Sequence, residues 1–202
     1  IESRLYAEDP YRNFLPSSGR LTRYRPPEET STESHVVRND TGVFEGGEIS
    51  MYYDPMIAKL CTWAPSRTSA IDYMRTALDR FEIEGICHNL PFLSAVMDHP
   101  KFVGGDFTTA FIGEEYPEGF DGVTLESDAL RNISASCAAM NRVAEIRRTK
   151  VSGRLDNHER KIGNDWVVKL QGQSFTVAIA ADPQGSDVVF EDGQILRVSG
   201  QW

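Results

Sequence analysis

The sequence predicts an α+β protein in which mixed or antiparallel sheets combine with helices. Residues 1–8 alternate between apolar and polar side chains, which is the period of a β-strand. Residues 128–149 contain neither Gly nor Pro and repeat apolar side chains at helical spacing, which predicts one long helix. Short alternating segments with tight turns then continue to residue 198, a pattern typical of an antiparallel strand meander.

Strands and turns are expected to alternate through the first 63 residues. Pro26-Pro27 ends one strand and Gly46-Gly47 marks a turn, because Pro and Gly interrupt regular structure most strongly. Residues 28–34 are polar and favour a loop. The expected strands cover residues 1–8, 21–25, 36–38 and 56–63.

Two helices are predicted after these strands. Ser66 suits an N-cap, because its side-chain oxygen can accept a hydrogen bond from the first helical turn. Pro91 suits the first turn of the second helix, which the sequence at 98–100 ends. Residues 107–112 form a further short element. The apolar face of the first helix, expected in the core, consists of Ile71, Met74, Leu78 and Phe81.

A domain boundary is predicted in the stretch 116–122, which has the composition of a linker. The two domains are expected to cover residues 1–120 and 121–202. After the long helix, a polar loop at 151–165 is longer than a simple connection to the next strand requires. The apolar residues that share one face of the long helix are Leu130, Ile133, Cys137, Met140 and Ala144. The predicted strands cover 166–170, 174–179, 187–190 and 194–198.

Composition and charge exclude several classes of function. The 202 residues carry a formal net charge of -9, whereas a nucleic-acid surface needs clustered Lys and Arg, so no nucleic-acid partner is expected. No apolar run approaches the roughly 18–20 residues that span a bilayer, so no membrane partner is expected. Cys61, Cys87 and Cys137 lack metal-ligand spacing, which predicts no metal site and reduced, small hydrophobic thiols in a cytoplasmic compartment.

Pattern alone leaves the chemical role of single residues open. Arg4 lies on a predicted strand, where an arginine is solvated, salt-bridged or functional. Asp54 stands before Pro55 and either orients a cation or serves as a turn residue. The Gly46-Gly47 pair lacks the Lys-Ser/Thr of a phosphate loop, so a hairpin is favoured. Since the chain opens in mid-strand without Met, we expect a fragment that carries part of an active site.

Four motifs stand in order along the chain: Ile1–Pro10, Phe14–Gly19, Gly46–Leu60 and Asn89–Leu93. Together they resemble the C-terminal subdomain of biotin carboxylase. Within the third motif, the sequence of residues 47–56 is most similar to the corresponding segment of propionyl-CoA carboxylase α subunits. Residues 125–202 resemble the beginning of the BT domain of those subunits. The resemblance implies a partial biotin carboxylase C-terminal subdomain at 1–120. It also implies a partial BT-like domain at 121–202, with a long helix, a hook-like loop and an incomplete antiparallel β-barrel.

The resemblance also implies roles for individual residues. Arg4 takes the place of the family's catalytic arginine, which stabilises the enolate-like oxygen of biotin. A planar, always-protonated guanidinium suits such a developing oxyanion. Asp54 takes the place of an acid that supports the active site, Thr109 that of a nucleotide-adjacent residue, and Arg38 that of an arginine at a subunit interface.

Cofactors and partners follow from the same resemblance. The parent enzyme is expected to be an acyl-CoA carboxylase that acts on propionyl-CoA or a similar acyl-CoA. It is expected to use Mg-ATP and bicarbonate to carboxylate biotin attached outside this segment. Its expected partners are the carboxyltransferase β subunit and the biotin carboxyl carrier domain. Ile162 and Trp166, beside the loop 151–165, are the expected anchors for the β subunit. The expected location is the cytoplasm, or the mitochondrial matrix in a eukaryote. The segment alone is expected to be inactive, and the alternative hypothesis is a non-catalytic assembly scaffold.

Overall fold

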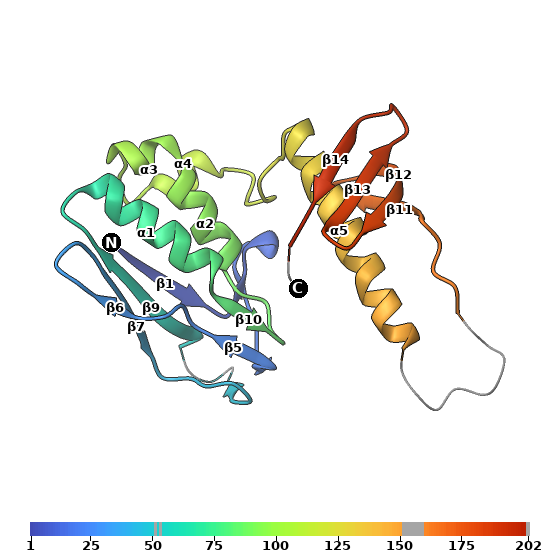
Figure 1. Cartoon of the computed structure of the whole chain (residues 1–202). Helices are drawn as coiled ribbons and strands as arrows, with labels where there is room; N and C mark the ends of the chain where they lie inside the picture. Colours follow the sequence, from blue (N-terminus) through green and yellow to red (C-terminus); the bar gives the residue numbers. More distant parts are fainter. Residues whose placement is uncertain (51, 53, 151–159, 201–202) are drawn as a thin grey trace. The chain divides into compact units, whose positions relative to one another are not determined.

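A computed structural model describes residues 1–50, 52, 54–150 and 160–200 (Figure 1). Contacts between residues divide the chain into two compact units, Ile1–Val123 and Thr124–Trp202, called here the first and the second unit. Each unit packs helical structure against an antiparallel sheet. Within the described ranges, every helix falls short of the length and apolar character that a membrane crossing requires.

The first unit is built on a four-stranded antiparallel sheet with the strand order β1-β9-β7-β6. Its strands are β1 (Glu2–Tyr6), β9 (Met56–Trp63), β7 (Val36–Thr41) and β6 (Thr30–Ser31). Three two-stranded sheets accompany it: β2 (Glu8–Asp9) with β3 (Leu15–Pro16), β4 (Gly19–Arg20) with β8 (Glu48–Ile49), and β5 (Arg23–Arg25) with β10 (Glu82–Glu84). The strand β1 therefore lies at an edge of the main sheet.

Alternation along β1 and β9 sorts their side chains between two faces of the sheet. Leu5 and Leu60 are fully buried in the core of the first unit. Arg4 and Lys59 are paired in register and belong to the opposite face. The predicted strand at 56–63 is confirmed in full, because its alternation extends over a complete strand.

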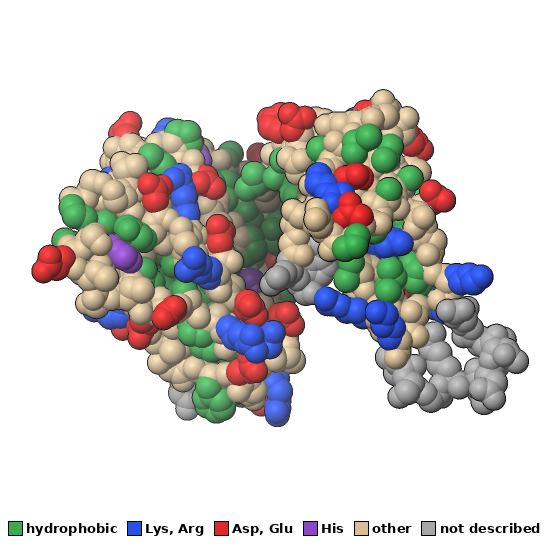
Figure 2. All heavy atoms as spheres, viewed as in Figure 1, with side chains coloured by type: hydrophobic (Ala, Val, Ile, Leu, Met, Phe, Trp, Pro, Cys, Tyr) green, Lys and Arg blue, Asp and Glu red, His purple; other side chains and the backbone are tan. Residues whose placement is uncertain are grey.

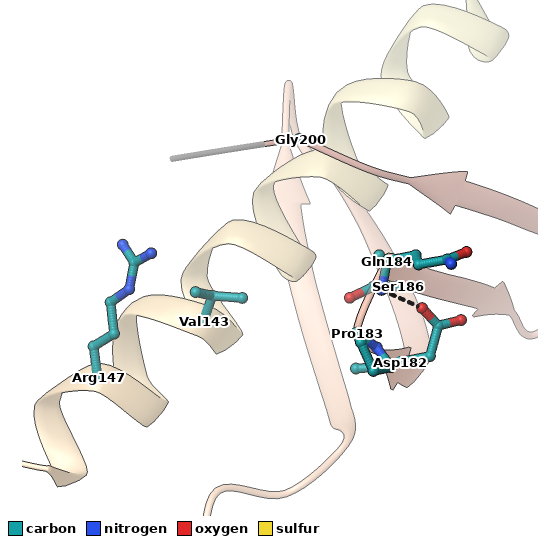
Figure 3. A pocket seen from close by; sticks show the side chains of 9 residues that line it. Val143, Arg147, Asp182, Pro183, Gln184, Ser186 and Gly200 are labelled. Atoms are coloured by element: carbon teal, nitrogen blue, oxygen red, sulfur yellow. Dashed lines mark hydrogen bonds between the residues drawn. The ribbon is translucent and has the colours of Figure 1, made fainter.

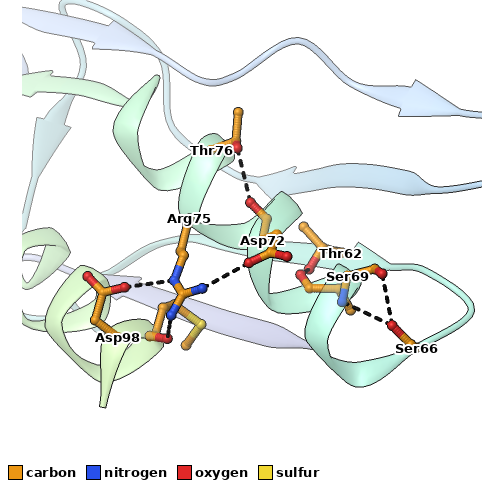
Figure 4. Close-up of polar contacts among 9 residues, drawn as sticks. Thr62, Ser66, Ser69, Asp72, Arg75, Thr76 and Asp98 are labelled. Carbon is orange, nitrogen blue, oxygen red and sulfur yellow. Dashed lines mark hydrogen bonds and ion pairs between the residues drawn. The ribbon is translucent and has the colours of Figure 1, made fainter. Parts of the chain in front are cut away.

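Helices α1 (Arg67–Asp79) and α2 (Leu90–Asp98) lie over the sheet (Figure 1). The predicted N-cap is confirmed, since the Ser66 hydroxyl accepts a hydrogen bond from the Ser69 N–H at 3.1 Å. Arg75 joins the two helices through an ion pair of 2.7 Å with Asp98 and also contacts Asp72 (Figure 4). The predicted core face of α1 is buried as expected. The short helices of this unit are η1 (Pro10–Arg12), α3 (Pro100–Gly104) and α4 (Phe111–Glu115).

Several short elements differ from the predictions. The strand β6 lies inside the stretch 28–34 that was expected to be a loop, and neither β10 nor α3 was predicted. A strand of two or three residues is too short to show an alternating pattern of side chains. Whether such a strand forms therefore depends on its pairing with another strand. The stretch 116–122 is also more than a linker, because Phe120 is only 3% exposed and packs 5.3 Å from the Phe92 ring.

The second unit consists of the long helix α5 (Ser127–Thr149) packed on a meander of four antiparallel strands in sequential order. The strands are β11 (Asp165–Leu170), β12 (Gln173–Asp182), β13 (Gly185–Phe190) and β14 (Ile195–Val198). The long helix and the meander are confirmed. Within the described residues the four strands form an open sheet, so a closed barrel is not seen and its completion stays a prediction.

Of the apolar residues that share one face of α5 by their spacing, only Leu130 is buried. Leu130 is 2% exposed, but Ile133 and Met140 are 38% and 45% exposed, and Cys137 is also exposed. The helix instead turns small side chains towards the sheet, because the sheet contributes the large ones and the two sets together fill the interior. The small buried residues are Ser134, Ala135, Ala138 and Ala139, and the large ones of the sheet are Val177, Ile179, Val188 and Phe190.

Candidate functional site

A cavity of about 490 Å³ in the first unit brings together two of the residues singled out from the sequence. Arg4 reaches it from β1, and Thr109 reaches it from the segment between α3 and α4. Aromatic side chains from α2 and α4, Phe92 and Phe111, form much of the remaining wall. The site therefore combines one guanidinium with a largely apolar, aromatic wall, which suits a ligand that has both a polar edge and a flat ring.

Arg4 is held by its neighbour on the same strand face. Its Nε donates to Glu2 Oε1 at 2.8 Å, and the two side chains are 56% and 43% exposed. Hydrogen bonding and attraction to Arg4 lower the pKa of Glu2, and the Glu2 carboxylate raises the pKa of Arg4. The pair therefore keeps opposite charges across the physiological range. A solvated pair of this kind contributes little stability, so its main effect is to orient the guanidinium.

Asn89 lines the same cavity and has a role that no local pattern of the sequence indicates. Its position before Pro91 resembles an N-cap, but the side chain makes no capping hydrogen bond. It contacts β1 instead, where Oδ1 accepts from the Tyr6 N–H at 2.9 Å and Nδ2 donates to the Arg4 carbonyl at 3.1 Å. No local pattern signals this contact, because 83 and 85 residues separate the partners.

The segment that carries Thr109 is anchored at both ends. At its start, His99 Nδ1 accepts from the Lys101 N–H at 3.3 Å, so the proton of a neutral ring lies on Nε2. That Nε2 donates to the Glu115 carboxylate at 3.1 Å, which ties α3 to the end of α4. Lys101 also pairs with Glu115 and lowers the pKa of that carboxyl group. These contacts hold the cavity wall at Thr109 in place.

Asp54 and Arg38 do not line this cavity. Asp54 is exposed, and its Oδ1 accepts from the Met56 N–H at 3.1 Å, which is the geometry of a turn residue. Its charge nevertheless acts at the site, because burial and Asp54 together raise the pKa of Glu8, which does line the cavity. Arg38 is 61% exposed and pairs with Asp40 at 3.1 Å.

Outside the cavity, neither acidic nor basic side chains gather into a single patch on the visible face of the first unit (Figure 2). Figure 2 shows acidic and basic side chains interspersed over the visible face of the first unit. Across the part of the chain that the structure describes, no group of three His, Cys, Asp or Glu residues gathers as metal ligands do. All three cysteines are free, as expected of reduced thiols, although Cys87 and Cys137 are exposed and therefore do not pack as small hydrophobic side chains.

The second unit contains a separate cavity of about 330 Å³ beside the turn that joins β12 to β13. Val143 and Arg147 of α5 line this cavity together with Asp182 and Gln184 at the turn (Figure 3). The Asp182 carboxylate accepts from the Gln184 N–H at 2.7 Å and pairs with Arg197, which lowers the pKa of Asp182. The carboxylate that lines this cavity is thus already paired, and we assign no ligand to the cavity.

The two predicted docking residues lie beside a segment outside the described residues, 151–159. Trp166 begins the inner face of β11 and packs against the core of the second unit, with Nε1 donating to the Gly163 carbonyl at 3.2 Å. Ile162 is partly exposed. Arg160 is tied to α5 by an ion pair of 2.7 Å with Glu145, which is only 8% exposed. The described end of the loop is therefore anchored to the helix.

Comparison with known proteins assigns a family to each unit. The family profile described as "Biotin carboxylase C-terminal domain" matches residues 2–114. The profile described as "Propionyl-coenzyme A carboxylase BT domain" matches residues 133–202. The chain therefore belongs to the family of biotin carboxylase C-terminal domains, which here is followed by a BT domain of the propionyl-CoA carboxylase type.

Individual relatives agree with this assignment. The propionyl-CoA carboxylase alpha chain of Ruegeria pomeroyi is 66% identical over 217 residues, covering 100% of this chain and 32% of that protein. The mitochondrial alpha chain of Homo sapiens is 36% identical over 208 residues, covering 100% of this chain and 28% of that protein. The chain thus spans about a third of the length of the curated relatives it matches.

A solved structure shares the fold of the first unit. The biotin carboxylase domain of the Hydrogenobacter thermophilus 2-oxoglutarate carboxylase, crystallised with MgADP, ADP and bicarbonate, is 40% identical with a TM-score of 0.54. The match covers 61% of this chain and 26% of that chain.

Proposed function

We propose that this chain is part of the biotin-containing α subunit of an acyl-CoA carboxylase, with propionyl-CoA as the acyl substrate. In this proposal the first unit contributes to the ATP- and bicarbonate-dependent carboxylation of biotin, and the second unit docks the carboxyltransferase β subunit. The observation that carries the proposal is the meeting of Arg4 and Thr109 in one aromatic-walled cavity. The relatives named above supply the choice of acyl substrate.

The chemistry of Arg4 suits carboxylation of a cyclic urea. When the biotin ring nitrogen attacks an electrophilic carbon, negative charge develops on the ureido oxygen. A guanidinium that is already oriented stabilises this charge without reorganising, and in a site that excludes water the effect is large. Glu2 orients Arg4 at Nε, and Asn89 holds the backbone at the Arg4 carbonyl and at the Tyr6 N–H.

The cavity also fits part of a nucleotide. An adenine ring is flat and apolar on its faces, and the wall beside Thr109 contains Phe107 and Phe111. ATP, when bound, supplies the phosphoryl group that activates bicarbonate. The described residues of this chain do not provide a ligand cluster for Mg²⁺, so we derive no role for them in holding that ion.

The proposed docking function rests on the second unit. Its loop 151–165 is longer than the connection requires, and the described end of that loop is held by the Arg160–Glu145 ion pair. Apolar side chains are also exposed on the strands, with Val167 and Ile195 each 59% exposed. These exposed residues favour the alternative function as well, in which the chain serves only as an assembly scaffold. The biotin carboxyl carrier domain is the further partner that biotin carboxylation requires.

Replacement of Arg4 tests the catalytic part of the proposal. In the full-length protein, Arg4→Ala should lower the turnover of biotin carboxylation by at least about 100-fold, with the KM for ATP little changed, because the guanidinium meets charge that appears only during the reaction. Arg4→Lys should also fail, since an ammonium group lacks the planar fork. Arg25→Ala, an exposed arginine on β5, is the matched control. Near-normal turnover in both Arg4 variants would contradict a catalytic role and favour the alternative, in which the chain is a non-catalytic assembly scaffold.

Changes in the docking loop test the second part. Replacing residues 152–163 by a short Gly/Ser turn should preserve biotin carboxylation but reduce co-purification with the β subunit. Ile162→Ser is a milder variant that should weaken the same complex, since apolar anchors dominate interface energetics. Size-exclusion chromatography of the two subunits measures the effect. Unchanged assembly in both variants would transfer the docking role to the exposed sheet face.

A further inference from the structure

The side chain of Asn89 occupies the place of a neighbouring strand along the free edge of β1. The strand β1 pairs with β9 on one side only. On its other side, Asn89 Oδ1 accepts from the Tyr6 N–H at 2.9 Å and Asn89 Nδ2 donates to the Arg4 carbonyl at 3.1 Å. The Asn89 backbone N–H adds a third bond, to the Tyr6 carbonyl at 3.1 Å.

Among side chains of this length in their ordinary ionisation states, only the primary amide of Asn can make both side-chain bonds. The Tyr6 N–H requires an acceptor and the Arg4 carbonyl requires a donor, so the orientation of the amide group is determined by its partners. Asn89 is 6% exposed, which means that water cannot easily replace either bond. Loss of the amide would leave two partly buried backbone groups of β1 without these partners, which costs free energy.

The position of these bonds coincides with Arg4. They hold the carbonyl of Arg4 itself and the N–H group two residues later, next to the irregularity in the β1–β9 register between Leu5 and Tyr6. An edge strand with such an irregularity has weaker pairing of its own, so the second set of bonds decides where its backbone lies. The Arg4 side chain projects from this backbone into the cavity.

We propose that Asn89 is a positioning residue for Arg4: its buried amide fixes the backbone from which the guanidinium reaches the reacting biotin. This inference rests on the proposed function, because it assumes that Arg4 acts in biotin carboxylation. Asn89 is not itself a reacting group. It acts through Arg4, and its removal shifts the guanidinium relative to the oxyanion.

A double-mutant cycle in the full-length protein tests the proposal. Asn89→Ala should lower the turnover of biotin carboxylation by about 10- to 100-fold, since a displacement near 1 Å has an effect of that size, while the KM for ATP changes little. In the Arg4→Ala background, Asn89→Ala should cause no further loss, because the group it positions is already absent. A purely structural role would give losses that multiply, and this result would overturn the proposal.

Two further variants guard against a folding effect. Pro91→Ala loosens the same first turn of α2 without touching β1 and should leave turnover unchanged.

Asn89→Asp keeps the shape of the side chain but places a carboxylate oxygen against the Arg4 carbonyl. Its turnover relative to wild type should recover as the pH falls, because a protonated carboxyl group donates a hydrogen bond again. A flat ratio across the pH range would contradict the proposal.

The outcomes separate this inference from the proposed function. If Arg4→Ala lowers turnover and Asn89→Ala does not, only the role of Asn89 is wrong. If Arg4→Ala itself retains turnover, the proposed function fails and the role of Asn89 fails with it.

Discussion

The two units pack a helix on an antiparallel sheet with side chains of different size on the helix. In the first unit, α1 turns large side chains inward, and Ile71, Met74 and Leu78 are all 0% exposed. In the second unit, α5 turns small side chains inward, with Ala135 and Ala139 at 1% and 0% exposure. In the first unit both the helix and the sheet contribute large buried side chains, whereas in the second unit the large ones come mainly from the sheet.

The difference teaches that apolar character alone does not select the buried face of a helix. Ile133 and Met140 are more apolar than the alanines of α5, yet they are 38% and 45% exposed. A helix that faces strands carrying Val188 and Phe190 has room for methyl groups and not for long side chains. Complementary volume therefore decides the face when a helix offers two apolar stripes.

The largest effect is expected from a methionine pair that compares the two helices directly. Met74→Ala should destabilise the first unit by about 2–5 kcal/mol, because it leaves a cavity in a closed core. Met140→Ala should change the free energy of unfolding by no more than about 0.5 kcal/mol, since the side chain is largely solvated. Urea unfolding with hydrogen exchange on peptides of each unit measures both. Equal effects would show that Met140 is buried in solution.

A smaller effect is expected from adding volume to α5. Ala139→Leu should destabilise the second unit by about 1–3 kcal/mol, because three extra carbon atoms do not fit against the sheet. Cys137→Leu adds similar volume on the exposed face of the same helix and should be close to neutral. The measurement is again urea unfolding resolved by hydrogen exchange. A stabilised Ala139→Leu variant would mean that the helix and the sheet are not closely packed.

The smallest effect concerns acid sensitivity. Burial lowers the pKa of His88 in the first unit, although its contact of 3.2 Å with the Ile83 carbonyl opposes this shift. Between the lowered pKa of His88 in the folded chain and its unfolded value near 6.5, the unfolded chain binds more protons than the folded chain. The stability of the first unit therefore falls as the pH drops through this window. His88→Gln should reduce the loss between about pH 7 and pH 5, read from urea midpoints. An unchanged pH slope would assign the acid sensitivity to other groups.

The candidate site shows the same division between local and distant information. The motif that begins the chain identified Arg4 by its resemblance to a family, and the loop after α3 identified Thr109 in the same way. The sequence did not show that these two residues line one cavity, nor that Asn89 holds the backbone of Arg4. Such facts depend on contacts across more than 80 residues, which no local pattern records.

The sequence by itself determined the elements that interact over a few residues. The strand at 56–63, the cap at Ser66 and the long helix at 127–149 follow from alternation, a hydroxyl at the right position and a run without Gly or Pro. Only the tertiary structure decided which face of α5 is buried and how β1 is held at its two edges. The reason is that a period or a cap involves neighbours along the chain, whereas packing volume and edge pairing involve partners that folding alone brings together.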